Sequence, residues 1–216
     1  LNRGKSSHTV SRSELTALAE WGQQRGVFLE SESRVIKNLL YLRDITVEDV
    51  MTPRTVMMAA SEEARLTDLF HREDFLRFSR IPIYQDNLDQ ITGYIHKHEL
   101  LEKLARDHHE MRLKDIRRDM IVVPDNTKLP AMFEQFIEER EQIALVTDEY
   151  GGTAGIVTLE DIIETLLGME IVDEFDTAAD MQHYARERWK SRATQLGLLP
   201  PAEESPTQKS DKDPNT

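Results

Sequence analysis

Two oxygen-bearing side chains, Thr158 and Asp161, stand three residues apart at the expected start of a helix. The preceding residues 155–157 predict a short strand after a Gly-Gly turn, and residues 162–168 continue as an apolar helical run. A hydroxyl and a carboxylate at this spacing can cap the free backbone amides of the helix. They can also turn outward and hold the two hydroxyls of a ribose. The spacing alone leaves both interpretations open.

The unit that contains this pair occurs twice in the chain. A repeat of this length is one supersecondary unit that cannot bury its own apolar face, so the two copies are expected to pack on each other. Three pairs of segments align: 93–99 with 155–161, 82–84 with 145–147, and 64–77 with 129–139.

Four segments match the motifs of a known family in order and spacing, over roughly residues 11–176: 47–54, 79–84, 149–161 and 170–174. On these segments the chain resembles the paired cystathionine-β-synthase (CBS) module of the CorC/CNNM (hemolysin C-like) family of membrane magnesium and cobalt transporters. The resemblance implies an α/β fold of tandem CBS repeats, a Bateman module, preceded by a short helical pair.

The resemblance also implies an adenine-nucleotide site and the role of each of its residues. Asp161 and Thr158 would hold the ribose, Arg80 the phosphates, and the backbone near Thr52 and Ile156 the adenine. The planar fork of an arginine suits phosphate oxygens. The implied ligand is ATP or AMP, with Mg²⁺ bound through the nucleotide and not by protein side chains.

At the matching positions the first repeat has His96 and Glu99. Histidine cannot replace the short hydroxyl, and the longer glutamate would have to reach less far to hold the same ribose. The sequence therefore predicts one working nucleotide site per chain.

Composition excludes several other classes of protein. The chain has 216 residues, no cysteine, a net charge of −13 and a pI near 5.0. The acidic balance argues against nucleic-acid and anionic-lipid partners, and the lack of cysteine fits a reducing, cytoplasmic setting. A polyphosphate would be repelled unless a divalent cation screens it, so MgATP is expected to bind better than free ATP.

No motif for catalysis stands out, which favours a sensor over an enzyme. There is no phosphate-binding loop of the Gly-x-x-x-x-Gly-Lys type, no dinucleotide fingerprint, and no evident pair of nucleophile and base. The pairs His96-x-His98 and His108-His109 lack the spacing and the third ligand of a metal site.

The organisation follows from the repeats. Residues 1–45 are expected to be a helical linker from a membrane domain that precedes the given sequence, 46–110 and 111–176 the two repeats, 177–199 a C-terminal helix and 200–216 a polar, disordered tail. In the C-terminal helix Met181, Ala185 and Trp189 lie near one face.

Within these units the local patterns predict further details. Ser11 or Ser13 should cap the first helix, Ser31 the second, and Ser61 the helix that carries Leu66, Leu69 and Phe70. Residues 56–60 and 121–123 read as strands, and Pro82 suggests that strand 79–84 is an edge or begins there. The expected buried face of helix 129–139 comprises Leu129, Met132, Phe133, Phe136 and Ile137.

The resulting hypothesis is a soluble fragment from the cytoplasmic face of a bacterial inner membrane. It binds an adenine nucleotide, forms a homodimer through the apolar helices of its repeats, and regulates divalent-cation transport by its membrane domain. The alternative is a constitutive dimerisation scaffold in which Thr158 and Asp161 only cap a helix.

Overall fold

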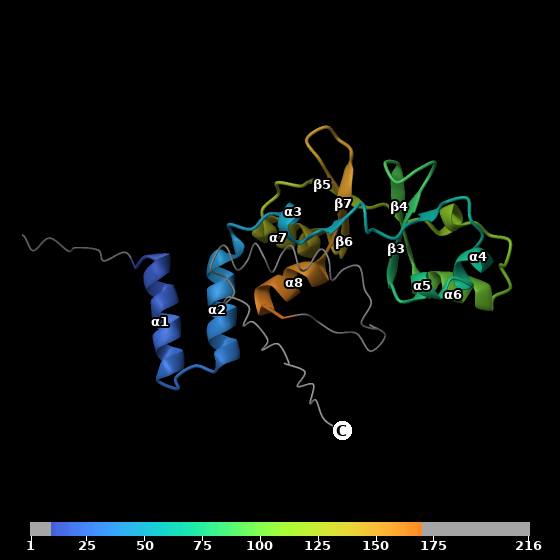
Figure 1. Ribbon diagram of the computed structural model, residues 1–216. Coiled ribbons are helices and arrows are strands. Elements are labelled where there is room, and N and C mark those ends of the chain that lie inside the picture. The colour runs from blue at the N-terminus through green and yellow to red at the C-terminus, as the bar shows by residue number, and fades with distance from the viewer. Residues whose placement is uncertain (1–9, 170–216) are drawn as a thin grey trace, which may run out of the picture.

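The computed structural model describes residues 10–169 (Figure 1). Its helices are α1 (Arg12–Gln24), α2 (Glu30–Leu42), α3 (Val47–Val50), α4 (Leu66–Phe70), α5 (Glu73–Leu76), α6 (Lys97–Ala105), the 3-10 turn η1 (Leu113–Ile116), α7 (Leu129–Glu139) and α8 (Leu159–Leu167). Its strands are β1 (Thr52–Pro53), β2 (Ala60–Ser61), β3 (Arg80–Tyr84), β4 (Ile91–His96), β5 (Ile121–Pro124), β6 (Ile143–Thr147) and β7 (Thr153–Thr158). The expected α/β fold of two repeats behind a helical pair is confirmed.

The strands form two sheets that repeat one plan. The first sheet has the order β2-β3-β4 and the second β1-β7-β6-β5, and each contains one parallel pair and one long antiparallel hairpin. In the hairpins Ile83 faces Gly93 and Val146 faces Gly155, and both ladders shift register at the next residue. The alignment of 82–84 with 145–147 therefore corresponds to the same place in both sheets.

Each repeat sends a short segment into the sheet of the other. Thr52 of β1 pairs with Ile156 of β7, and Arg118, which precedes β5, forms a bridge with Tyr94 of β4. A glycine accepts the crossing backbone on each side. A Cβ at Gly155 would lie 2.2 Å from the Thr52 carbonyl oxygen, and one at Gly93 would lie 2.2 Å from the Arg118 carbonyl oxygen.

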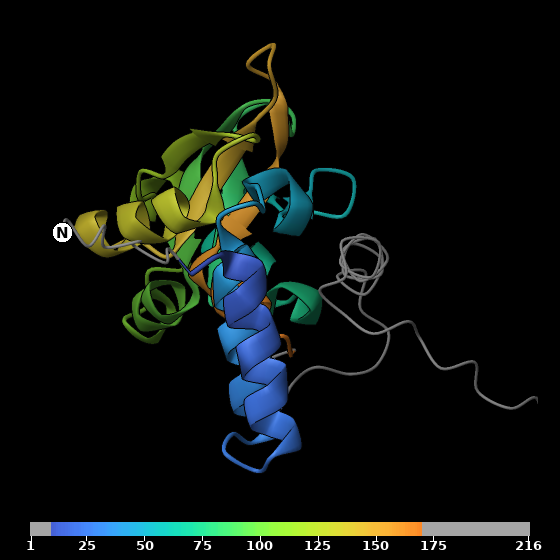
Figure 2. The ribbon, with the colours of Figure 1, turned by 90° about the vertical axis from the view of Figure 1, so that its left-hand side faces the viewer.

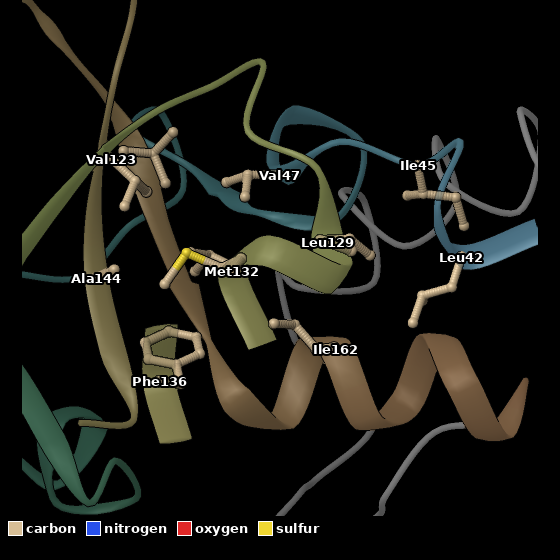
Figure 3. Close-up of a cluster of buried hydrophobic side chains, with 11 residues drawn as sticks. Leu42, Ile45, Val47, Val123, Leu129, Met132, Phe136, Ala144 and Ile162 are labelled. Carbon is tan, nitrogen blue, oxygen red and sulfur yellow. The ribbon is translucent and has the colours of Figure 1, made fainter. Parts of the chain in front are cut away.

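Two separate apolar cores lie under the two sheets, and the crossing segments contribute to them. Val47 of α3 lies in the core of the second repeat, whereas Leu113 of η1 lies in the core of the first. In the second core the side chains of Met132 and Phe136 on α7 and Ile162 on α8 lie close to the sheet (Figure 3). The repeats are thus interlocked and not merely adjacent.

The helices α1 and α2 form an antiparallel hairpin beside the second repeat (Figures 1 and 2). Ser33 Oγ donates to the Ala19 carbonyl oxygen at 3.2 Å, which joins the two helices at a buried point. On another face α2 packs on α8, where Asn38 Nδ2 donates to the Leu166 carbonyl oxygen at 3.1 Å. The hairpin is therefore anchored to the helix that begins at Thr158.

Of the caps predicted for these two helices, the one of α1 is confirmed and the one of α2 is wrong. Ser11 caps α1 as expected, with its Oγ accepting from the Glu14 amide at 3.2 Å. The prediction that Ser31 caps α2 is wrong, because the helix already begins at Glu30. The amide of Leu29 instead donates to the Glu32 carboxylate at 2.8 Å, so the carboxylate takes the place of a capping hydroxyl.

Residues 56–77 are more broken than the pattern predicts. The amides of Val56 and Met57 both donate to the Pro53 carbonyl oxygen at 3.0 Å, which makes a turn, so the strand comprises only Ala60 and Ser61. The helix begins after Arg65, without a cap from Ser61, and the expected 64–77 helix divides into α4 and α5.

The predicted place of Pro82 in its sheet and the predicted buried face of α7 are also corrected. Pro82 lies in the central strand of its sheet and not at an edge; it is tolerated because β2 pairs only with Ile83 and Tyr84. Phe133 and Ile137 on α7 are 38% and 57% exposed, since only the face with Leu129, Met132 and Phe136 meets the core.

The acidic segment 170–176, the C-terminal helix 177–199 and the tail 200–216 lie outside the described residues. The boundaries assigned to the repeats and to these segments stay predictions.

We predict that Gly155→Ala lowers the free energy of unfolding by about 1–3 kcal/mol, because the new methyl group would overlap the Thr52 carbonyl oxygen. Urea denaturation followed by circular dichroism measures the loss. Gly152→Ala is the control: its Cβ would meet only the Asp148 carboxylate, which can move aside. Equal losses in the two variants would contradict the close approach of β1.

Candidate functional site

Thr158 and Asp161 form a reciprocal cap at the start of α8. Asp161 Oδ2 accepts from the Thr158 amide at 2.8 Å and from its hydroxyl at 2.7 Å, while Thr158 Oγ1 accepts from the Asp161 amide at 3.3 Å. The capping interpretation is therefore realised in the structure.

The pair presents several oxygen acceptors at the start of α8. A hydroxyl has one donor and two acceptor positions, and a carboxylate has about four acceptor positions. The bonds between Thr158 and Asp161 use the hydroxyl proton, one hydroxyl acceptor position and two positions on Oδ2. Oxygen acceptors of this kind suit a ligand that donates through two hydroxyls.

The pairing of β1 with β7 brings two more of the predicted residues to this place. Thr52 lies opposite Ile156, which precedes Thr158 by two residues on the same strand. Because side chains alternate along a strand, Ile156 and Thr158 point to the same side of the sheet, while Val157 points into the core. Thr52, Ile156, Thr158 and Asp161 thus surround one end of β7.

The fifth predicted residue, Arg80, reaches this end from the first repeat. Its Nη2 donates to Gln142 Oε1 at 2.6 Å, and the Gln142 carbonyl oxygen accepts from the amide of Leu159, the first residue of α8, at 3.1 Å. The Nε atom of Arg80 is buried, and no residue in the described range accepts a hydrogen bond from it. The guanidinium therefore stands beside the start of α8 with donor capacity for an anion.

Gln142 also belongs to this site, although its role was not predicted from the sequence. It precedes the apolar run of β6 and carries no motif of its own. The repeat alignment places Ser79 at the equivalent position, so the glutamine could be recognised as a partner of Arg80 only once the two repeats were packed.

At the matching place in the first repeat, an ion pair joins Arg118 and Glu99. Arg118 stands where the second repeat has Thr52, and its Nη2 lies 3.1 Å from Glu99 Oε2, the carboxylate that aligns with Asp161. An arginine side chain thus contacts the carboxylate that a ribose would need. Arg118 was also missed, because the alignment of the two crossing segments becomes evident only in the fold.

The pKa of His96 depends on charged residues from both repeats. Burial, together with the positive charges of Arg80 and Arg118, lowers the pKa of His96 below its ordinary value of 6.5, and Glu99 and Glu141 act in the opposite direction. Nearby, Tyr94 Oη donates to Glu141 Oε2 at 2.8 Å, and burial followed by this bond raises the pKa of the phenol. The junction is therefore one electrostatic unit built from both repeats.

The described range contains neither a cluster of metal ligands nor a membrane-spanning helix. Among residues 10–169 no three His, Cys, Asp or Glu side chains converge as a metal centre would require. The same residues include no helix with the length and apolar character of a membrane span.

Comparison with known proteins gives a consistent result. The family model for the CBS domain matches residues 113–168. A UPF0053 protein of Synechocystis is 33% identical over 199 residues, covering 91% of this chain and 57% of that protein. The magnesium and cobalt efflux protein CorC of Escherichia coli is 30% identical over 185 residues, covering 85% of this chain. The chain spans 57% and 63% of the lengths of these two relatives.

Solved structures extend the likeness. The CBS domain of a bacterial CNNM/CorC family Mg²⁺ transporter superposes with a TM-score of 0.69 at 34% identity, over 76% of this chain and 99% of that one. A structure of such a domain in complex with ATP gives 0.61 at 35% identity, over 65% and 99%. A CBS-domain pair with bound AMP from Klebsiella pneumoniae gives 0.52 at 25% identity, over 57% and 99%.

The lowered pKa of His96 predicts a loss of stability in mild acid. Between that pKa and 6.5 the unfolded chain binds a proton that the folded chain does not, so the free energy of unfolding falls as the pH drops through 6.5. The slope attributable to His96 stays below about 1.4 kcal/mol per pH unit, the value for one full proton. His96→Asn should flatten the pH dependence of the free energy of unfolding, measured by urea denaturation from mild acid to neutral pH. An unchanged slope in His96→Asn would contradict the assignment.

Proposed function

The chain belongs to the CorC/CNNM family of Mg²⁺ transporters, and from this premise we propose that its CBS pair is a cytosolic regulatory module. The module binds one adenine nucleotide per chain, in the form of MgATP. Binding controls the transport of divalent cations by a membrane domain of the full-length protein. The module itself catalyses no reaction.

The observation that carries this proposal is the meeting of groups from both repeats. Arg80 of the first repeat reaches the start of α8, where Thr158 and Asp161 of the second repeat stand. Hydroxyl-binding acceptors beside a cationic fork match the two polar parts of a nucleotide, ribose and phosphate. The backbone of Thr52 and Ile156 lies alongside and suits recognition of the base.

The proposal includes a route from this site to the membrane domain through α8 and α2. A ligand that joins Arg80 to α8 favours one relative placement of the two repeats. The far end of α8 is held by Asn38 of α2, so a shift of α8 moves the helical hairpin that leads toward the membrane domain. Coupling between sites of this kind typically amounts to about 1–3 kcal/mol.

A second candidate function is a scaffold that dimerises without nucleotide. It is favoured by one observation, the reciprocal cap, because Thr158 and Asp161 already satisfy each other. In that case loss of Asp161 would change only the stability of α8, by about 1 kcal/mol.

Both functions include a homodimer, for which α7 offers a surface. Phe133 and Ile137 are large apolar side chains on the outer face of α7, and Leu101 is similarly exposed on α6 of the first repeat. Exposed apolar patches of this kind are typical of interaction sites. We infer that these helices form the dimer contact.

Isothermal titration tests the nucleotide site. We expect ATP with Mg²⁺ to bind at one molecule per chain, and Asp161→Ala to abolish the binding while the missing cap costs about 1 kcal/mol of stability. Glu99→Ala, at the matching position of the first repeat, should leave affinity unchanged. The same titration with EDTA should give weaker binding, because the chain carries a net charge of −13 and repels free ATP.

The outcomes separate the two functions. No binding of ATP, ADP or AMP to the unaltered chain would support the scaffold. Equal affinities with Mg²⁺ and with EDTA would contradict MgATP as the preferred form.

We predict that Ile137→Glu converts the dimer to a monomer, since it places a charge in the apolar contact at a cost of several kcal/mol. Sedimentation equilibrium gives the mass. Leu18→Glu, on the exposed side of α1, is the matched control at similar exposure and should remain dimeric. A dimer in both variants would exclude α7 as the contact.

A further inference from the structure

The helical hairpin carries an apolar stripe that the described residues leave partly exposed. Leu15, Leu18 and Trp21 follow each other at intervals of three on α1, so they are neighbours on its surface. They are 40%, 53% and 52% exposed, whereas Ala19, which faces α2, is buried. We call these three residues the α1 stripe. The guanidinium of Arg25 lies over the Trp21 ring, 3.9 Å from its centroid, but this contact leaves half of the ring exposed, whereas a helix normally buries its apolar side chains against a partner.

The chain leaves the second repeat at this hairpin. Helix α8 ends at Gly168 in a left-handed turn with a φ of 64°. A Cβ there would lie 2.5 Å from Asn38 Nδ2 and 3.0 Å from Arg34 Cδ, both on α2. Helix α8 therefore ends against α2, the helix that pairs with α1 in the hairpin (Figure 1).

The continuing chain contains a segment with a complementary pattern. In residues 178–195 the apolar Met181, Ala185 and Trp189 recur at intervals of four, which predicts a helix with one apolar face. Between Met169 and Met181 the chain can span up to about 40 Å. Packed helices lie about 8–10 Å apart, so this reach is sufficient to cross α2 and arrive at α1.

We propose that residues 178–195 dock on the α1 stripe of the same chain, with Trp189 against Leu18 and Trp21. Because residues 178–195 belong to the same chain as the stripe, their effective concentration there is about millimolar, so even a small apolar contact is populated. The contact makes the hairpin a three-helix unit and ties the C-terminal segment to the element that leads toward the membrane domain. It requires no nucleotide and stands independently of the proposed ligand site.

The two tryptophans of the chain lie on the two sides of this contact, which allows a direct test. In the full-length 216-residue chain with Trp21→Phe, Trp189 is the only tryptophan. We expect its emission to be blue-shifted and its quenching by acrylamide to be slow. Adding Leu18→Glu should shift the emission to the red and raise the quenching constant severalfold, toward that of a free tryptophan.

The control is Ile137→Glu in the same Trp21→Phe background, because Ile137 is similarly exposed but lies on α7. It should leave the signal of Trp189 unchanged, and circular dichroism should show all variants folded. Trp189 that is fully quenchable in the parent, or shielded but insensitive to Leu18→Glu, overturns the proposal.

Two further readings distinguish other occupants of the stripe. Shielding that weakens on dilution in both the parent and the Ile137→Glu variant would mean that a second copy supplies the segment. Shielding that arises only when anionic phosphatidylglycerol vesicles are added would assign residues 178–195 to a lipid surface. Either result overturns docking within one chain.

Discussion

The crossing of backbone between the two repeats is the constraint on which the rest of this structure depends. Thr52 pairs with Ile156 in the second sheet, and Arg118 pairs with Tyr94 in the first. A side chain on the strand residue just before each pairing would overlap the carbonyl oxygen of the crossing segment, which explains a glycine at both 155 and 93. Because each repeat completes the other, the site at the end of β7 exists only when both are folded and packed.

The two repeats share one backbone plan, but the residues around β7 differ from those around β4. Around β7 a hydroxyl and a carboxylate cap α8, with Arg80 alongside. Around β4 the equivalent carboxylate, Glu99, is paired with Arg118. A half-exposed ion pair of this kind adds little to stability. Its consequence is chemical: the carboxylate already has a cationic partner, and the two ends of the pseudo-symmetric module are not equivalent.

Helix α8 connects the site to the hairpin through its two termini. Its first turn carries the cap of Thr158 and Asp161, and its last carbonyl groups and Gly168 lie against Asn38 and Arg34 of α2. A rigid helix of this length transmits displacement from one end to the other, since its internal hydrogen bonds resist bending. The hairpin therefore contacts the end of the helix that begins at the site.

The amino-acid sequence by itself determined the repeated α/β plan. Apolar periodicity and glycine positions are properties of the local sequence, and both recur when 93–99 is aligned with 155–161. It also singled out the five residues that the fold gathers at the end of β7, although their ligand stays a prediction. Sequence could not determine the start of α2, where the Glu32 carboxylate replaces a hydroxyl cap, or the central place of Pro82, which depends on how short the neighbouring strand is. Gln142 and Arg118 gain their roles only from contacts across the repeats. Such contacts join residues far apart in the chain, so only the tertiary structure decides them.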